Sequence, residues 1–176
     1  MNSAVISTLP DDHHQRVLDL WDDLHDEFGI DPASELPPPH ISYHVAEKYD
    51  KTTVESRLHS VTPEVNPFTV HTGGLGVFTA APVIYLPLAR SPNLAALHDR
   101  VWTSLTDFAD HADHYYHPDR WFPHITLAYY SLDEELVGDV VSYLSDRSFD
   151  WEMRVEDIAH LESNDGETRI CSRVEF

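Results

Sequence analysis

The sequence has very few positive charges. Lysine and arginine together number 11 among the 176 residues, against 31 aspartates and glutamates, and the lysines are Lys48 and Lys51. Nucleic acids attract proteins mainly through lysine and arginine, so this balance disfavours a protein that grips a long nucleic acid by its backbone. A strongly acidic surface is typical of salt-accumulating organisms, in which concentrated salt screens the repulsion between carboxylates. We therefore expect a halophilic protein whose fold needs high salt.

Cysteine and long apolar runs are also scarce. Cys171 has no second cysteine with which to form an internal disulfide, which fits a reducing compartment. No stretch approaches the roughly 20 apolar residues of a membrane-spanning helix, and Met1–Pro10 has neither the basic start nor the apolar core of a signal peptide. We expect a cytoplasmic monomer with no membrane association, no cofactor and no bound metal.

One short phrase occurs twice in the chain: Pro-His-Ile-Ser around His40 and Pro-His-Ile-Thr around His124. Each phrase opens an apolar run with the composition of a β-strand. Because residues i and i+2 of a strand point to the same face, His40 should project beside Ser42, and His124 beside Thr126. The two copies lie about half the chain length apart, which indicates an internal duplication.

Hydrophobic periodicity and turn signals place both phrases in equivalent surroundings. Each phrase follows a strand and a helix, and precedes another helix and strand. Strands are expected at 4–8, 40–47, 67–72, 83–89, 122–130, 149–161 and 167–176, and helices at 11–28 and 52–60, with two more starting at Ser91 and Ser131. The predicted fold is α+β: one domain over 1–176 with pseudo-symmetric lobes at roughly 1–80 and 81–176, two antiparallel sheets around a central cleft, and helices outside.

Two histidines and two hydroxyls in one cleft suit acid–base chemistry on a phosphate ester. An imidazole can accept or donate a proton near neutral pH, so His40 and His124 are the predicted catalytic pair, one as base and one as acid. Ser42 and Thr126 would bind the non-bridging phosphate oxygens. A metal is not needed, because the leaving oxygen receives a proton. A single copy of the phrase would carry little weight, because a lone strand histidine is usually structural.

Strict alternation extends the motif strands toward further candidate residues. It places His44 beyond Ser42 and Tyr130 beyond Thr126, so we predict both as secondary substrate-binding residues. The alternatives are a solvent-facing histidine and an ordinary strand aromatic. The histidines within 111–117 have some character of a zinc site, but no cysteine or second ligand cluster has a suitable spacing. We expect a solvated loop there.

The doubled motif resembles the two-histidine (2H) phosphoesterase superfamily, in its 2′-5′ RNA ligase and cyclic phosphodiesterase branch. That family's pattern is histidine, a hydrophobic residue and serine or threonine, twice, and it is met at 40–42 and 124–126. The segment Gly-Leu-Gly-Val-Phe at 74–78 and the whole phrase at 122–128 add to the resemblance. Together with the order of helices and strands, the resemblance covers nearly the entire chain.

The resemblance implies a duplicated, two-lobed LigT-like fold and metal-independent chemistry on 2′,3′-cyclic phosphates of nucleotides or RNA ends. One histidine would activate water or a 5′-hydroxyl, and the other would protonate the leaving 2′- or 3′-oxygen; the reverse reaction would form a 2′-5′ linkage without ATP. The sequence leaves open which histidine is the base. The scarcity of basic residues favours small cyclic phosphates or short ends over large RNAs. The alternative is a nucleotide- or RNA-end-binding module of the same fold without turnover.

Overall fold

The computed structural model of the chain describes residues 2–79, 81–129, 132, 134–164 and 167–176. The strands are β1 (Asn2–Thr8), β2 (His40–Tyr49), β3 (Phe68–His71), β4 (Gly76–Phe78), β5 (Val83–Pro87), β6 (Ala109–Ala112), β7 (His124–Ala128), β8 (Glu152–Val155), β9 (Asp157–Asn164) and β10 (Glu167–Glu175). The helices are α1 (Asp11–Phe28), α2 (Pro32–Glu35), α3 (Lys51–Val61), α4 (Pro92–Leu105) and α5 (Glu134–Ser145), with short 3₁₀ turns η1 (Thr62–Glu64), η2 (Thr106–Phe108) and η3 (His114–Tyr116).

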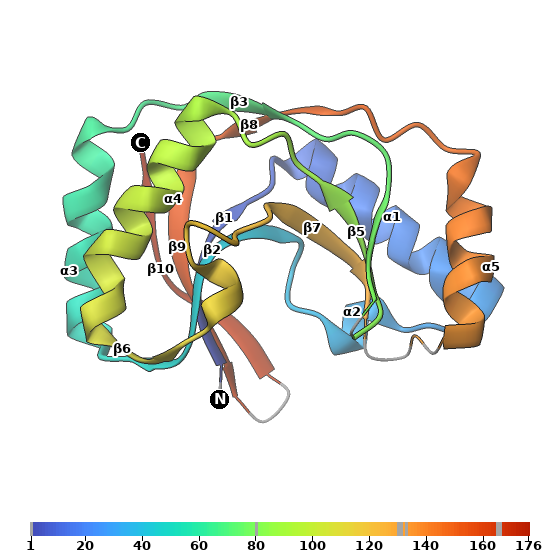
Figure 1. Cartoon of the computed structure of the whole chain (residues 1–176), viewed down its shortest axis with the longest axis horizontal. Coiled ribbons are helices and arrows are strands. Elements are labelled where there is room, and N and C mark those ends of the chain that lie inside the picture. Colours follow the sequence, from blue (N-terminus) through green and yellow to red (C-terminus); the bar gives the residue numbers. More distant parts are fainter. Residues whose placement is uncertain (1, 80, 130–131, 133, 165–166) are drawn as a thin grey trace.

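The strands pair in antiparallel sheets. Within the described residues, the largest sheet has five strands in the order β10-β9-β1-β2-β6, and a smaller sheet has the order β4-β5-β7. Strand β3 pairs with β8, and a bridge between Thr72 and Leu88 joins this pair to the end of β5. The motif strands β2 and β7 belong to different sheets but contact each other near the middle of the molecule (Figure 1).

Helices cover the outer sides of the sheets, as predicted. Helices α3 and α4 lie together at one end of the molecule, where α4 contacts β2 and α3 contacts β9 and β10 (Figure 1). At the other end α1 contacts β7. Helix α5 is tied to α1 by the ion pair of Arg147 with Asp23 at 2.6 Å and by the edge-to-face rings of Phe28 and Tyr143. The α+β architecture with antiparallel sheets and external helices is therefore confirmed.

The first long helix has the predicted bounds, and local chemistry explains both its face and its end. Val17, Leu20 and Leu24 are buried along one side of α1. The helix stops at Gly29, whose φ of 69° is left-handed and whose N–H donates to the carbonyl of His25. Helix α4 begins as predicted, with the Ser91 hydroxyl accepting from Leu94 N–H. No helix in the described ranges is long and apolar enough to cross a membrane.

Each motif strand is anchored by the residues between its polar ones. Ile41 and Ile125 are fully buried in the main hydrophobic core, whereas the neighbouring histidines and hydroxyl residues are half-buried. Burying one such side chain contributes about 1.5–3 kcal/mol. A one-residue slip would expose these anchors, so the core fixes which face carries the histidines.

The predicted strand at 149–161 is two strands in different sheets. Strand β8 pairs with β3, whereas β9 pairs with β1, and Glu156 lies between them. The hairpin of β9 with β10 is present as predicted, with Asn164 opposite Glu167. Strands β4 and β6 and the short helix α2 were not predicted from the sequence. Of these, β6 overlaps the start of the histidine-rich segment, where a solvated loop was expected, and pairs with the end of β2.

The two lobes do not correspond to the two halves of the chain. Strand β1 lies between β2 and β9, so the five-stranded sheet combines strands from before residue 80 with β6, β9 and β10 from the second half. Helix α1 crosses from this sheet to cover β7 of the other. The boundary expected near residue 80 therefore divides sequence repeats and not sheets.

Candidate active site

The two motif histidines occupy equivalent positions at the start of β2 and β7. His40 and His124 each follow a proline, which favours an extended chain. His40 Nδ1 lies 2.7 Å from the carbonyl oxygen of Pro38, and His124 Nδ1 lies 2.7 Å from that of Phe122. Each ring is thus held by the backbone two residues before it.

These hydrogen bonds fix the tautomer of both rings. A carbonyl oxygen only accepts, so Nδ1 must carry the hydrogen in His40 and in His124. In the neutral ring Nε2 then has no hydrogen and can accept a proton. In the charged ring the Nε2 hydrogen is the one that can be donated, because the Nδ1 hydrogen is bonded to the backbone carbonyl. The geometry therefore presents the same atom of both imidazoles for proton transfer.

The two imidazoles are close enough to influence each other. Burial lowers the pKa of His40 to about 4; the hydrogen bond to Pro38 opposes this, and the charge of His124 lowers the pKa further. Burial also lowers the pKa of His124, against its hydrogen bond to Phe122. The pair therefore resists double protonation, and an anionic phosphate beside the rings would favour the singly protonated state that acid–base catalysis needs.

The motif hydroxyls share a face with their histidines. Ser42 pairs with Ile6 and His40 with Thr8, so both project from one face of the five-stranded sheet. In the smaller sheet Thr126 pairs with Tyr85.

Aromatic side chains from the loop before β7 fix Ser42. The indole of Trp121 donates to the Ser42 carbonyl at 2.9 Å. On the side of β2 away from β1, the described part of β6 pairs only from Ala46 onward and does not reach Ser42. The Ser42 side chain is close enough to influence the Tyr116 hydroxyl. Burial and Asp113 raise the pKa of Tyr116 to about 12, although Ser42 opposes the rise. Tyr116 is therefore a neutral hydroxyl beside the motif, and no sequence pattern pointed to it.

The prediction that His44 lines the site is wrong. In the β1–β2 pairing Ile6 lies opposite Ser42 and Val5 opposite His44, so Tyr43 is skipped and forms a β-bulge. Val5 and Ile6 are neighbours on β1 and so face opposite sides of the sheet. Their partners His44 and Ser42 therefore also face opposite sides. The side chain is fully buried, hydrogen-bonds Tyr49 and packs 4.8 Å from the Trp102 ring.

The second motif strand has its bulge at the equivalent place. Between β5 and β7, Tyr85 lies opposite Thr126 and Ile84 opposite Ala128, so Leu127 is skipped. Ala128 is buried like His44. In both strands the residue after the hydroxyl bulges, so the duplication extends to backbone irregularities. Tyr130, the other secondary candidate, lies outside the described residues.

We expect acid to destabilise the protein through His44. Burial, with a smaller effect of the His98 charge, lowers the pKa of His44 to about 4, whereas an unfolded histidine titrates near 6.5. Between these two pKa values the unfolded state binds more protons than the folded state. The contribution of neutral His44 to the free energy of unfolding is therefore complete above about pH 6.5, and it falls by about 1.4 kcal/mol per pH unit as the pH drops toward 4. His44→Phe keeps a ring against Trp102 but cannot titrate. Its free energy of unfolding in urea should fall less steeply over this window; parallel curves would contradict the account.

Three aromatic residues around His124 were not singled out by sequence. The rings of Phe78 and Tyr85 stack at 4.2 Å and lie 5.2 and 5.3 Å from the His124 ring, and Phe122 packs edge-on against both. Gly76 makes room for them, because a Cβ there would lie 2.3 Å from the Tyr85 ring. The signal was the glycine-rich segment before β4. The rings of Phe78 and Tyr85 therefore pack against the imidazole, and Phe122 is half-exposed next to them.

The histidine-rich segment and Lys51, one of the two lysines, form contacts of their own. Lys51 Nζ lies 3.4 Å from Glu162 Oε2, on the helix-covered face of the large sheet. Among the histidines within 111–117, His114 and His117 are ring neighbours at 5.7 Å. In the described residues they do not converge with a third ligand into a metal site.

Comparison with known proteins agrees with this geometry. The family model of the 2′-5′ RNA ligase superfamily matches residues 9–167. A Bacillus cereus (strain B4264) protein named "Putative phosphoesterase" is 28% identical over 131 residues, which cover 72% of this chain and 71% of that one. A Bacillus cytotoxicus protein of the same name is 28% identical over 143 residues, 78% of each chain.

Solved structures share the fold along the whole chain. TT0787 of Thermus thermophilus matches with a TM-score of 0.72 and 15% identity, covering 99% of this chain and 97% of that one. E. coli LigT, crystallised with NADP+, matches with a TM-score of 0.64 and 14% identity, covering 99% and 96%. With the family model spanning most of its length and both histidine motifs in equivalent strands, this chain belongs to the 2′-5′ RNA ligase superfamily of 2H phosphoesterases.

Proposed function

We propose that the protein is a metal-independent phosphoesterase that opens 2′,3′-cyclic phosphates of nucleotides or short RNA ends. His40 and His124 are its acid–base pair, and Ser42 and Thr126 bind the phosphate. The observation that carries the proposal is the matched hydrogen bond of each imidazole Nδ1 to the backbone, at 2.7 Å in both. A histidine with a purely structural role does not require a second histidine held in the same way on another sheet. A general base and a general acid that act on the same phosphorus do require two such histidines.

In hydrolysis, a water oxygen bonds to phosphorus while the bond from phosphorus to the ribose 2′- or 3′-oxygen breaks. One imidazole accepts the water proton at Nε2, and the other gives its Nε2 proton to the departing oxygen. The two hydroxyls donate to the non-bridging oxygens, which carry the negative charge in the transition state. When a 5′-hydroxyl takes the place of water and the 3′-oxygen leaves, the same steps form a 2′-5′ linkage.

A nucleotide ligand also has support from a protein of the same fold. A cavity of about 450 Å³ adjoins the start of β2, where Pro38 and Pro39 precede His40 and Thr8 lies opposite it. Its lining includes neither motif histidine, nor Ser42 or Thr126, so it lies beside the proposed phosphate site and does not contain it. E. coli LigT, which shares the fold, has been crystallised with 3′-AMP and with ATP, which supports a nucleotide ligand here.

The direct test is hydrolysis of a 2′,3′-cyclic nucleotide in high-salt buffer with a chelator present. We expect turnover to a 2′- or 3′-monophosphate at a rate that the chelator does not change. Binding of the nucleotide without product, even after long incubation, would favour the non-catalytic module. Inhibition by the chelator would contradict the metal-independent mechanism.

A further inference from the structure

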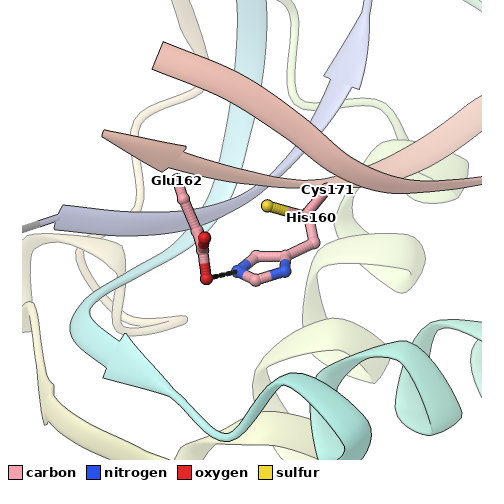
Figure 2. A group of neighbouring side chains, drawn as sticks. All are labelled: His160, Glu162 and Cys171. Carbon is pink, nitrogen blue, oxygen red and sulfur yellow. Dashed lines mark ion pairs between the residues drawn. The ribbon is translucent and has the colours of Figure 1, made fainter. Parts of the chain in front are cut away.

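A cluster of side chains with metal-ligand atoms lies on the face of the large sheet that His40 does not share. His160 and Glu162 of β9 and Cys171 of β10 each offer a ligand atom, and these atoms all lie within 4.8 Å of one another. Figure 2 shows the carboxylate beside one ring nitrogen, with the thiol projecting into the same space. His160 lies opposite Val5 of β1, on the face to which His44 is turned.

Backbone register brings the cysteine to this cluster. His160 and Glu162 are two residues apart on β9 and so share a face. On β10, Ile170 lies opposite Leu161 and Ser172 opposite His160, so Cys171 is skipped and forms a bulge. Bulges re-aim side chains, and this one leaves Cys171 on the side of His160 at an otherwise solvent-exposed position. The thiol is therefore both convergent with the other two groups and open to solvent.

We propose that His160, Glu162 and Cys171 form a binding site for a divalent transition-metal ion of the zinc type. The ligands are imidazole Nε2, a carboxylate oxygen and the thiolate sulfur, with water in the fourth position of a tetrahedron. Mixed nitrogen, oxygen and sulfur donors suit zinc and cobalt, and disfavour magnesium and calcium, which select oxygen alone. On binding, the thiol gives its proton to solvent and the sulfur bonds to the metal.

The two oxygens of Glu162 face different partners. Oε1 lies 4.0 Å from His160 Nε2, on the metal side. Oε2 lies 3.0 Å from Arg169 and 3.4 Å from Lys51. A metal can therefore take Oε1 while Arg169 holds Oε2, which is the usual second hydrogen bond of a ligating carboxylate. His160 Nε2 is hydrogen-bonded to the Ser3 hydroxyl at 2.8 Å, and this hydrogen bond must break when Nε2 binds the metal.

The protonation states fit metal binding. Burial lowers the pKa of His160, so its imidazole is neutral and has a lone pair to give. Burial alone would raise the pKa of Glu162, but the Arg169 and Cys171 hydrogen bonds and the Lys51 charge lower it to about 2, so it is ionised. Burial and Glu162 raise the pKa of Cys171. The free thiol is thus protonated and unreactive, and a bound metal would be what ionises it.

Cobalt(II) is the probe that tests the site, because a thiolate bonded to it absorbs in the near ultraviolet. Chelator-treated, reduced full-length protein should develop this band on titration with Co²⁺, saturating at one ion per chain. Zn²⁺ should displace it. Cys171→Ser should abolish the band, and His160→Gln should weaken metal binding by roughly 10–100-fold or more. A rise in melting temperature with Zn²⁺ should occur in the wild type and be lost in Cys171→Ser.

His114→Ala is the matched control, because it removes a histidine from the other histidine-rich segment and should leave the band unchanged. Circular dichroism should show that Cys171→Ser is folded, which is expected for a near-isosteric change at an exposed residue. No near-ultraviolet band in the wild type would overturn the proposal, as would a band that survives Cys171→Ser. Hydrolysis of the cyclic nucleotide should be unaffected by Cys171→Ser, so failure here does not depend on the proposed function.

Discussion

Replacing His124 with alanine is expected to lower kcat for a 2′,3′-cyclic nucleotide by roughly 10²–10⁴-fold, and His40→Ala by a similar factor. Each ring supplies a proton transfer made only in the transition state, so kcat should fall more than the affinity for substrate. The measurement is single-turnover hydrolysis at saturating substrate, with binding followed separately by calorimetry. The wild-type pH profile should be bell-shaped, because the step needs one charged and one neutral imidazole. Its two apparent values belong to the coupled pair and not to either residue.

Two controls separate chemistry from structure in this experiment. The His44→Phe variant changes a histidine four residues after His40 that is buried away from the motif face, so it should retain most of the activity. The double variant of His40 and His124 should be little worse than either single variant, because groups that act as a unit are not additive. Near-full activity in either folded alanine variant would contradict acid–base catalysis by His40 and His124.

Strand alternation predicted which motif side chains share a face, as far as regular strand geometry extends. Alternation placed Ser42 with His40 and Thr126 with His124, and both pairs share a face in the structure. Alternation failed after Ser42, because Tyr43 is an extra, bulged residue that neither strand propensity nor periodicity reveals. His44 was misplaced for this reason alone. A strand pattern read from a single sequence is therefore reliable only up to the first irregularity.

Sheet assignment could not be predicted in the same way. Helix α1 was correct to the residue, because its apolar spacing, its glycine end and its neighbours are all local signals. The chain at 149–161 divides at Glu156 because β8 pairs with β3 and β9 pairs with β1. Pairing between strands distant in sequence is a long-range property. Short elements such as β4 were missed for a related reason. Their value lies in contacts such as that of Gly76 with Tyr85, which only the folded chain reveals.

Within the described residues, three register irregularities lie next to the histidine motifs or at the single cysteine. Tyr43 and Leu127 follow the two motifs, and Cys171 is the bulge of β10. A bulge bends the strand and re-aims side chains, so it can gather polar groups that strict alternation would separate. The matching bulges after both motifs mean that each histidine strand leaves the site in the same manner. Duplication of a bulged strand, and not of the four-residue phrase alone, accounts for the symmetry of the site.

Transfer from molar salt to dilute buffer is expected to unfold much of the protein. The formal net charge is −20, and the scarce cations are concentrated at a few carboxylates. Arg173 contacts Asp157 at 2.6 Å, and Arg169 and Lys51 both serve Glu162. Other acidic surfaces are left with little compensation. In about 1 M salt the Debye length is about 3 Å and screens this repulsion, whereas at 0.01 M it is about 30 Å and spans the molecule.

Helix α1 allows the electrostatic cause to be isolated. Its exposed side carries Asp19, Asp22 and Asp26 at spacings of three and four residues, where like charges repel. Asp22→Lys converts both neighbouring repulsions into attractions without touching the buried face. The salt concentration at half-unfolding, followed by far-ultraviolet circular dichroism, should therefore fall in Asp22→Lys and stay nearly unchanged in the neutral, helix-favouring Asn93→Ala at an exposed position of α4. A nonionic osmolyte at matched osmolality should not restore the wild-type spectrum. Retention of the full spectrum in dilute buffer would show that the acidic surface does not set the stability of this fold.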